Sequence, residues 1–214
     1  MATPASPPSS RVESRRAAMR AEALDHAIAL MTEEGAGALS LSEVARRLGI
    51  RGPSLYKYFP SRNALYDALF ARGLAEEQAA VQAALVGVPR GTQRIRAGGE
   101  AVVRWAVEHP ALAQLLHWRP VPGFQPSPQT FEPSREDMAT VQEEFAEAVR
   151  LGQLSPAANG EDAVRLYTVV LSGLISQQLA NQPGVTYGEG TFSRLTGTAI
   201  DLFLSAYDPP GTTM

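Results

Sequence analysis

One short stretch of the chain combines residue types that can bind a nucleic acid. Gly52, Ser54, Tyr56, Lys57 and Tyr58 place small, hydroxyl-bearing and cationic side chains close together. Lysine can donate to a guanine edge or a phosphate oxygen, hydroxyls can donate to phosphates, and small residues permit close backbone approach. The stretch is therefore a candidate surface for contacts with double-stranded DNA.

The rest of the sequence offers little catalytic chemistry. The chain has no cysteine, which excludes a thiolate nucleophile, disulfides and sulfur-ligated metal sites. His109 and His117 have no further metal-ligand spacing around them, and no serine elbow or glycine-rich phosphate loop is present. A hydrolase or isomerase that uses one of these histidines with Glu108 or Asp137 has no motif to support it. We expect no enzyme activity, no cofactor and no metal.

Charge is distributed unevenly along the chain. Residues 11–62 carry nine basic and six acidic groups, a net charge of +3, whereas the remainder carries −6. A basic head on an acidic body suggests a polyanionic partner for the head alone, although so small an excess also arises by chance. Arg15 and Arg16 suit phosphate or minor-groove contacts, or simple solvation.

The elements that carry these residues are expected to be helical throughout, because no segment alternates as a strand does. We expect an all-α fold: a disordered arm over 1–10, a three-helix domain over 11–62, a bundle of about six helices over 63–206 and a tail over 207–214. Helical patterns between glycine and proline breaks cover 11–34, 41–48, 53–59, 62–86, 92–108, 110–117, 134–151, 161–182 and 189–206.

Two of these helices are short and closely linked. Ser40 and Glu43 form a capping box before the first, Gly49 ends it, and Pro53 suits the first turn of the second. This pattern is typical of a helix-turn-helix. Each helix offers one apolar i,i+4 pair to a common core: Val44 with Leu48, and Leu55 with Phe59.

Residues 48–65, LGIRGPSLYKYFPSRNAL, resemble the TetR family of transcriptional regulators, and the resemblance extends over roughly residues 11–70. It implies an all-helical homodimer with a DNA-binding head and a C-terminal domain that binds a ligand and dimerises. Arg51 stands where many members have a serine or threonine that caps the second short helix. Either another group caps that helix here, or Arg51 itself faces a phosphate. Arg62 stands where many have lysine. The positions that the resemblance assigns to DNA contact are Ser42, Gly52, Pro53, Ser54, Tyr56, Lys57, Tyr58 and Arg62.

An aromatic-rich segment of the C-terminal part is the candidate ligand pocket. Residues 105–110 and 119–124 also resemble a C-terminal domain found in part of the same family. The alternative is a plain hydrophobic core under a long loop over 118–133. Five prolines in this segment argue against a regular helix. A loop of this length acts as a lid or as a connector. The candidate pocket residues are Trp105, His109, His117, Trp118, Phe124, Phe145 and Tyr167.

The last two helical patterns carry apolar stripes within 161–206. By resemblance these helices form a four-helix interface with a second copy of the chain. The alternative is that the stripes face the chain's own core. Their residues are Val164, Leu171, Leu174, Ile175, Leu179, Leu195, Ala199, Leu202 and Phe203.

Together these features predict a cytoplasmic, sequence-specific DNA-binding regulator. We expect a homodimeric repressor that an unknown small molecule releases from a palindromic operator. The alternative is a sequence-tolerant architectural DNA-binding protein, against which the acidic body argues. No apolar run is long enough for a membrane span, and no leader pattern is present, so no membrane association is expected.

Overall fold

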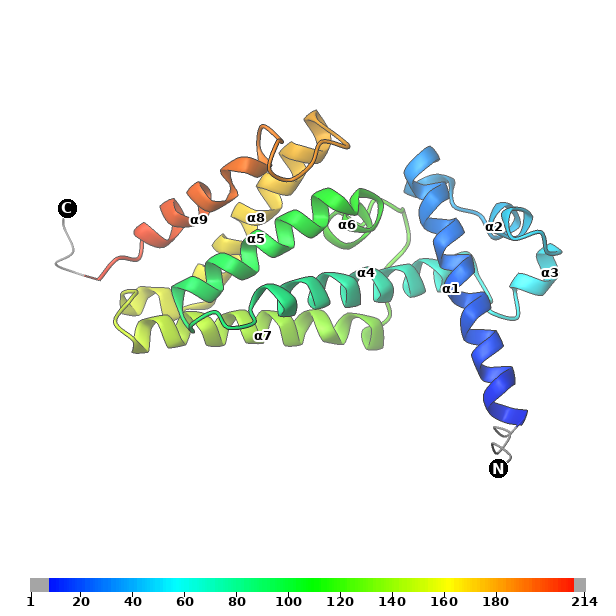
Figure 1. Ribbon diagram of the computed structural model, residues 1–214, viewed down its shortest axis with the longest axis horizontal. Coiled ribbons are helices and arrows are strands. Elements are labelled where there is room, and N and C mark those ends of the chain that lie inside the picture. Colours follow the sequence, from blue (N-terminus) through cyan, green and yellow to red (C-terminus); the bar gives the residue numbers. More distant parts are fainter. Residues whose placement is uncertain (1–7, 210–214) are drawn as a thin grey trace, which may run out of the picture.

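The computed structural model describes residues 8–209, and every regular element in that range is helical (Figure 1). The all-helical expectation is confirmed. Residues 1–7 of the expected arm and 210–214 of the expected tail lie outside the described residues. The α-helices are α1 (Pro8–Glu34), α2 (Leu41–Arg47), α3 (Gly52–Leu55), α4 (Arg62–Ala84), α5 (Thr92–Glu108), α6 (Pro110–His117), α7 (Pro128–Arg150), α8 (Glu161–Asn181) and α9 (Thr196–Ser205).

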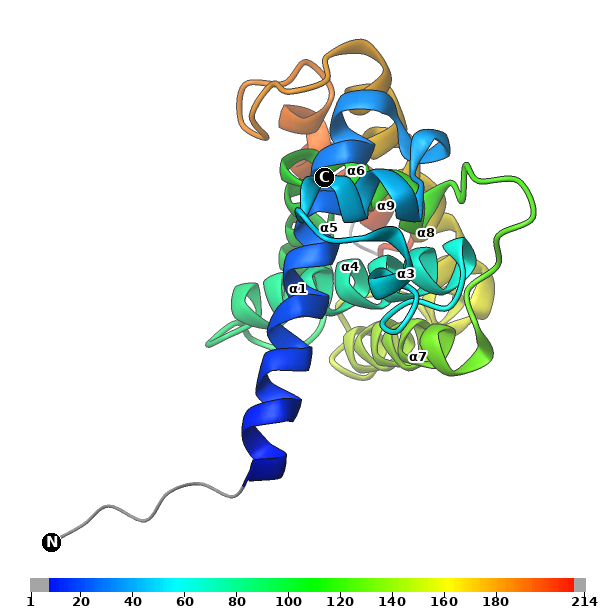
Figure 2. The ribbon, with the colours of Figure 1, turned by 90° about the vertical axis from the view of Figure 1, so that its right-hand side faces the viewer.

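The first three helices form a head at one end of an elongated body (Figures 1 and 2). Helix α1 turns an apolar side toward the core, with Ala23, Ala27 and Leu30 fully enclosed. Leu55 and Phe59 from the second short helix and its following turn are buried in the same core. Local i,i+4 spacing therefore fixes the interior of the head.

Two helix starts in the head are capped by serine side chains, but the predicted capping box is incomplete. The Ser40 hydroxyl accepts from the Glu43 amide at 3.2 Å, and the Ser61 hydroxyl accepts from the Ala64 amide at 3.1 Å. The Glu43 carboxylate does not complete a capping box, because it accepts instead from Arg46 at 2.6 Å. A charged donor on the same helix outcompetes the backbone amide for this acceptor.

Helix α4 belongs to both the head and the body. Near its start the Tyr66 hydroxyl donates to the Ala36 carbonyl at 2.5 Å, within the head. The next residue, Asp67, accepts from the Ser127 amide at 2.7 Å and from the Thr130 hydroxyl at 2.7 Å. The predicted boundary at residues 62–63 thus falls at the first residues of the helix that both parts share.

The segment 118–133 is shorter as a loop than the sequence suggests. Helix α7 begins at Pro128 and contains Pro133, although the prolines argued against a helix before residue 134. Pro128 occupies the first turn, where a missing amide costs nothing, and the Ser127 hydroxyl accepts from the Thr130 amide at 3.2 Å. Capping and the contacts of Asp67 therefore outweigh the single disruption at Pro133.

Three other helix bounds differ from those expected. Helix α1 begins at Pro8 rather than at residue 11, and α9 begins at Thr196 rather than at residue 189. Helix α3 ends at Leu55, and residues up to Phe59 continue as a turn in which the Phe59 amide donates to the Leu55 carbonyl at 3.0 Å. These are changes at helix ends, where backbone groups have competing partners.

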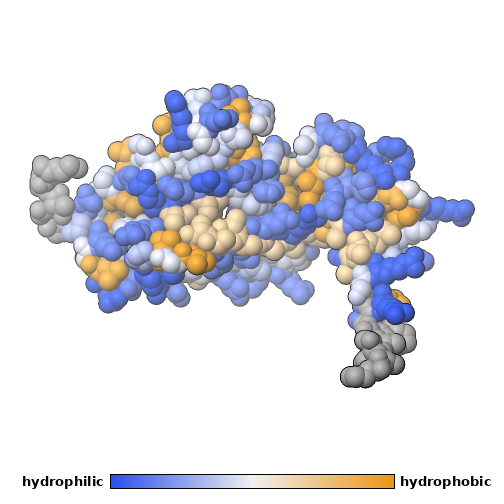
Figure 3. Space-filling view, viewed as in Figure 1, coloured by the Kyte–Doolittle hydropathy of each residue, from blue (hydrophilic) through white to orange (hydrophobic). Residues whose placement is uncertain are grey.

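The body packs α5, α7, α8 and α9 around an aromatic centre. Phe145 is fully buried between Tyr167 and Phe203, with ring centroids 5.7 and 6.0 Å away. On the face seen in Figure 3 the surface is mostly hydrophilic, with a weakly apolar band over the C-terminal half of α4. Among the described helices, none has the length and apolar character needed to cross a bilayer.

Candidate DNA-binding interface and effector cavity

The residues expected to contact DNA lie on adjoining elements of the head. They occupy the start of α2, the start of α3, the turn after α3 and the start of α4 (Figure 2). No acidic residue occurs between Glu43 and Asp67, so the part of the surface from α3 to the start of α4 carries positive charge only. Exposed among the expected residues are Arg15, Arg16, Ser42, Arg51, Pro53, Tyr56, Lys57 and Arg62, and partly exposed are Gly52, Ser54 and Tyr58.

The two tyrosines of this surface differ in setting. Tyr56 is 54% exposed, which favours a contacting side chain over a core position. Tyr58 is half-buried and packs against the head core. Arg51 precedes α3 without capping it through its side chain, so its guanidinium is available to an outside partner.

Two arginines of α1 hold the turn that follows α3. Arg20 donates to the Tyr58 carbonyl at 2.6 Å, and its guanidinium lies 4.6 Å from the centre of the Phe59 ring. Arg16 donates to the Lys57 carbonyl at 3.4 Å. The structure thus places Arg16 beside the expected DNA surface and identifies Arg20 as a support for it. The two arginines are one helical turn apart, which places both on the same side of α1.

Arg47 joins α2 to the end of α1. Its guanidinium lies 2.7 Å from Glu33 and 3.1 Å from Glu43, and its side chain is largely covered. Hydrogen bonds from Arg46 and Arg47 lower the pKa of Glu43 to about 2. Hydrogen bonding to Arg47 likewise lowers the pKa of Glu33. Arg47 therefore holds α2 against the end of α1, and its side chain is not simply solvated.

The larger cavity of the body has a volume of about 520 Å³ and lies among α4, α5, α7 and α8. Of the residues expected in a pocket, His117 and Tyr167 line it. The apolar part of its wall includes Phe70, Leu74, Ile95, Phe131, Leu171 and Ile175. A mostly apolar cavity with a few polar groups is the usual form of a small-molecule site.

Three of the other expected pocket residues lie elsewhere. Trp105 is buried and stacks on His109, with ring centroids 5.2 Å apart and planes at 16°. The Trp105 indole nitrogen has no hydrogen-bond partner within the described part of the chain. Trp118 is 38% exposed at the end of α6. These three do not line the larger cavity.

The remaining two expected residues are core residues near the cavity. Phe124 is buried against Tyr66, with ring centroids 5.4 Å apart, under the loop before α7. Phe145 lies in the aromatic centre of the body beside Tyr167. For Phe124 and Phe145 the alternative therefore holds: both rings belong to a hydrophobic core and not to a pocket wall.

Polar groups of the cavity wall come mainly from α4, α6 and α7. His117 Nε2 lies 3.1 Å from a Glu77 carboxylate oxygen, and Gln78 donates to Asp137 at 2.8 Å. Burial raises the pKa of Asp137, with a smaller contribution from the charge of Glu77. Sequence reasoning missed Gln78 and the cavity position of Asp137, because their contact joins residues 59 positions apart.

The end of the cavity away from the head carries a buried carboxylate, Glu144. It accepts from Arg90 at 2.9 Å and from the Gly91 amide at 3.1 Å, with Arg94 3.6 Å away. Tyr167 closes the wall nearby, where its hydroxyl donates to the Ile95 carbonyl at 2.6 Å. Burial raises the pKa of Tyr167, so its hydroxyl stays protonated.

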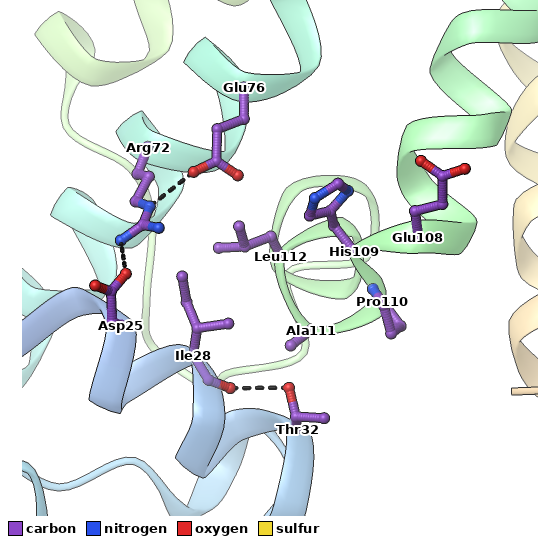
Figure 4. A pocket seen from close by; sticks show the side chains of 10 residues that line it. All are labelled: Asp25, Ile28, Thr32, Arg72, Glu76, Glu108, His109, Pro110, Ala111 and Leu112. Carbon is purple, nitrogen blue, oxygen red and sulfur yellow. Dashed lines mark hydrogen bonds and ion pairs between the residues drawn. The ribbon is translucent and has the colours of Figure 1, made fainter. Parts of the chain in front are cut away.

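A second cavity of about 500 Å³ lies where the head meets the body (Figure 4). Its walls come from α1, α4, the end of α5 and the start of α6, and His109 lines it. On one side Arg72 lies between Asp25 at 2.6 Å and Glu76 at 2.7 Å. On this side of the cavity the guanidinium bridges the head to the body.

The apolar stripes expected at a dimer interface face mainly inward. Within α8 and α9 the chain's own core takes up Val164, Leu171, Ile175, Leu179 and Phe203. These five residues therefore follow the alternative, in which the stripe faces the chain's own core. Their i,i+3 and i,i+4 spacing places them on the side of each helix that is turned toward α5 and α7. Leu202 and Leu195 of the expected set are exposed.

Metal-ligating groups do not gather in the part of the chain that the structure covers: no three histidine, aspartate or glutamate side chains there could hold an ion.

Two family models match separate parts of the chain. Residues 23–69 match "Bacterial regulatory proteins, tetR family", and residues 95–196 match "Tetracyclin repressor-like, C-terminal domain". The first covers the helix-turn-helix and the start of α4, and the second covers most of the cavity wall contributed by α5 to α8.

Individual proteins support the same assignment. The HTH-type transcriptional regulator Rv1816 of Mycobacterium tuberculosis is 32% identical over 100 residues, which span 46% of this chain and 43% of that protein. The structure of the regulatory protein SCO4313 superposes with a TM-score of 0.72 and 26% identity, covering 95% of this chain and 100% of that one. The transcriptional regulator FadR of Bacillus subtilis shares the fold, with a TM-score of 0.72, 12% identity, and coverage of 86% and 97%. The chain belongs to the TetR family of transcriptional regulators, a family of non-enzymatic proteins, with an N-terminal helix-turn-helix and a C-terminal TetR-like domain.

Proposed function

We propose that this regulator is a homodimeric repressor that a small molecule releases from a palindromic operator in the cytoplasm. The observation that carries the proposal is the course of α4. Its first residue, Arg62, lies at the expected DNA surface, and its later turns supply Phe70, Leu74 and Glu77 to the larger cavity. One rigid helix thus touches both sites.

Contacts of α4 provide the means of coupling. Asp67 binds the first turn of α7, which forms another wall of the cavity, and Tyr66 binds the head. A ligand that separates α4 from α7 would therefore shift the head relative to the body. A few kcal/mol of difference in ligand affinity between two head positions is enough to change DNA binding.

Dimerisation is supported by the outer faces of α8 and α9. Leu166 and Val169 on α8, and Leu202 on α9, are exposed apolar side chains, and Val169 and Leu202 are about two thirds exposed. Covering such side chains with their symmetry mates would place two heads on one DNA molecule, with recognition helices about 34 Å apart for successive major grooves.

A structural relative supports a ligand in the body. FadR of Bacillus subtilis was solved in complex with stearoyl-CoA. Likeness to FadR extends to the fold alone, and the chemistry of the ligand for this chain rests on its own cavity residues.

The test is footprinting at fixed salt on DNA upstream of the gene for this protein and its neighbours. We expect a discrete, two-fold symmetric footprint that is lost in Lys57→Ala and in Tyr58→Ala. Arg194→Ala, which removes an exposed arginine beside α9, is the matched control and should leave the footprint intact. Loss of a single phosphate or base contact costs about 1–3 kcal/mol per subunit.

Other outcomes would contradict the proposal. Operator affinity that is unchanged in both recognition-element variants would remove the head from DNA binding. Binding to random DNA with a steep salt slope and no preferred site would instead favour the architectural alternative.

A further inference from the structure

The cavity among α4, α5, α7 and α8 contains one carboxyl group without a cationic partner. Asp137 accepts from the amide of Gln78 at 2.8 Å, and this is a neutral donor. Among residues 8–209, no arginine, lysine or histidine lies within ion-pair distance of Asp137. A carboxylate on a largely apolar wall is costly unless a positive charge or strong donors face it.

The charged neighbours of Asp137 are already engaged or are themselves acidic. Arg135 binds Glu132 at 3.0 Å and lies over the Phe131 ring, and His117 lies against Glu77 at 3.1 Å. The negative charges of Glu77 and Glu136 act on Asp137 in the same direction as its burial and raise its pKa. This end of the cavity therefore has an excess of negative charge.

The opposite end has no such excess. Glu144 receives hydrogen bonds from Arg90 and from the Gly91 amide, and Arg94 stands close to it while donating to the Val88 carbonyl at 2.9 Å. These arginine donors are occupied by protein acceptors. An anionic ligand would have to displace them, whereas a cation at Asp137 would meet a carboxyl group whose one donor, the Gln78 amide, is neutral.

We propose that the cavity selects a ligand with an apolar body and one basic amine, whose ammonium group is held by Asp137. The proposal rests on the function proposed above and specifies the chemistry of its effector. The apolar walls from Phe70, Leu74 and Ile95 would enclose the hydrocarbon part of the ligand. Gln78, held by its own donation to Asp137, fixes the direction in which the carboxylate faces.

The experiment compares three probes with the same ten-carbon chain at pH 7: decylamine, 1-decanol and decanoate. Titration calorimetry on the full chain should show the amine binding about tenfold more tightly than the acid, with the alcohol between them, as expected when one buried charge is matched or opposed. In Asp137→Asn the affinity for the amine should fall about tenfold, while the affinity for the alcohol should remain. Retained alcohol binding also shows that this variant is folded.

Glu143→Gln is the matched control, because Glu143 is an exposed carboxylate on the same helix and does not line the cavity. It should leave all three affinities unchanged. Tighter binding of decanoate than of decylamine, amine binding that survives Asp137→Asn, or binding of none of the probes would overturn the proposal.

Footprinting with the same probes separates the two proposals. Asp137-dependent amine binding without release of the operator upholds the cavity preference and contradicts the ligand-released repressor. Release of the operator by the alcohol and the acid as readily as by the amine contradicts the cavity preference and upholds the repressor.

Discussion

Asp25 on α1 and Arg72 on α4 form an ion pair of 2.6 Å that joins the head to the body. The same guanidinium binds Glu76 one turn further along α4, so its position is fixed from the body side (Figure 4). Because both partners are partly exposed, the pair contributes about 1 kcal/mol or less to the free energy of unfolding. Its effect lies in the orientation of the head.

Replacing this arginine should therefore change regulation more than stability. In Arg72→Gln we expect operator affinity to fall about fivefold, because a looser head must be ordered when it docks on DNA. Fluorescence anisotropy with operator DNA measures this. Arg150→Gln, which breaks an exposed pair with Glu147 at the far end of α7, should have no effect. Equal affinities for the two variants would contradict the role of the bridge.

Arg20 should support the turn after α3. Arg20→Met keeps the aliphatic stem but removes the bond to the Tyr58 carbonyl and the stacking on Phe59. We expect a loss of about 1–3 kcal/mol in the free energy of unfolding, measured with urea, together with weaker operator binding. Arg11→Met, at an exposed position of the same helix, is the control. If Arg20→Met is destabilised no more than this control, the turn after α3 does not depend on Arg20.

Two adjacent glycines of α5 should respond in opposite ways to alanine. A Cβ on Gly99 would lie 2.2 Å from the Tyr167 hydroxyl, whereas a Cβ on Gly98 has nothing nearer than a Val81 methyl at 3.9 Å. Gly99→Ala should therefore destabilise the body by about 1–3 kcal/mol. Gly98→Ala should stabilise it by up to about 1 kcal/mol, through helix propensity. Thermal unfolding of both variants checks the contrast, and the same sign in both would refute it.

Acid should weaken the ion pairs within α2. The pKa of Glu43 is lowered to about 2 by hydrogen bonds from Arg46 and Arg47, below the ordinary glutamate value. The stability that this carboxylate contributes is fully present above pH 5 and is lost as the pH falls toward 2. In Glu43→Gln the decline of stability between pH 5 and pH 2 should be shallower. A carboxyl resonance for Glu43 that titrates near pH 4.5 would argue against the interaction.

The dimer proposal can be tested on the outer face of α9. Leu202→Glu places a charge on a residue that is 68% exposed in the single chain, so it should leave folding intact and abolish association. Sedimentation equilibrium measures the change. Val86→Glu, at an equally open position between α4 and α5, should remain dimeric. A monomeric wild type would refute the interface at once.

The arrangement of the helix-turn-helix could be predicted from the sequence because its signals are local. Caps at Ser40 and Ser61 and the i,i+4 pairs ending at Leu55 and Phe59 act within single turns of helix. These signals leave few ways to arrange the two short helices, so the set of exposed residues follows from them. The support from Arg20 needed the packing of α1 across the turn, which sequence spacing alone does not give.

The cavity could not be predicted in the same way. Clustering of aromatic residues along the chain pointed to Trp105 and Trp118, yet one is buried in a stack with His109 and the other lies at the surface. The cavity is formed where α4 meets α7, and the contact between Gln78 and Asp137 depends on how these helices pack. The prediction that no helix precedes residue 134 was wrong for a similar reason. Capping of α7 by Ser127 outweighs the loss of one backbone hydrogen bond at Pro133.

The shortness of α3 bears on how this regulator can evolve. Its core is anchored by Leu55 and Phe59, and its backbone is held from outside by arginines of α1. The outward side chains, such as those of Tyr56 and Lys57, contribute almost nothing to folding. Substitutions at these positions can therefore accumulate without loss of the protein, and under the proposed function a lineage would acquire a new operator sequence while its ligand response remained unchanged.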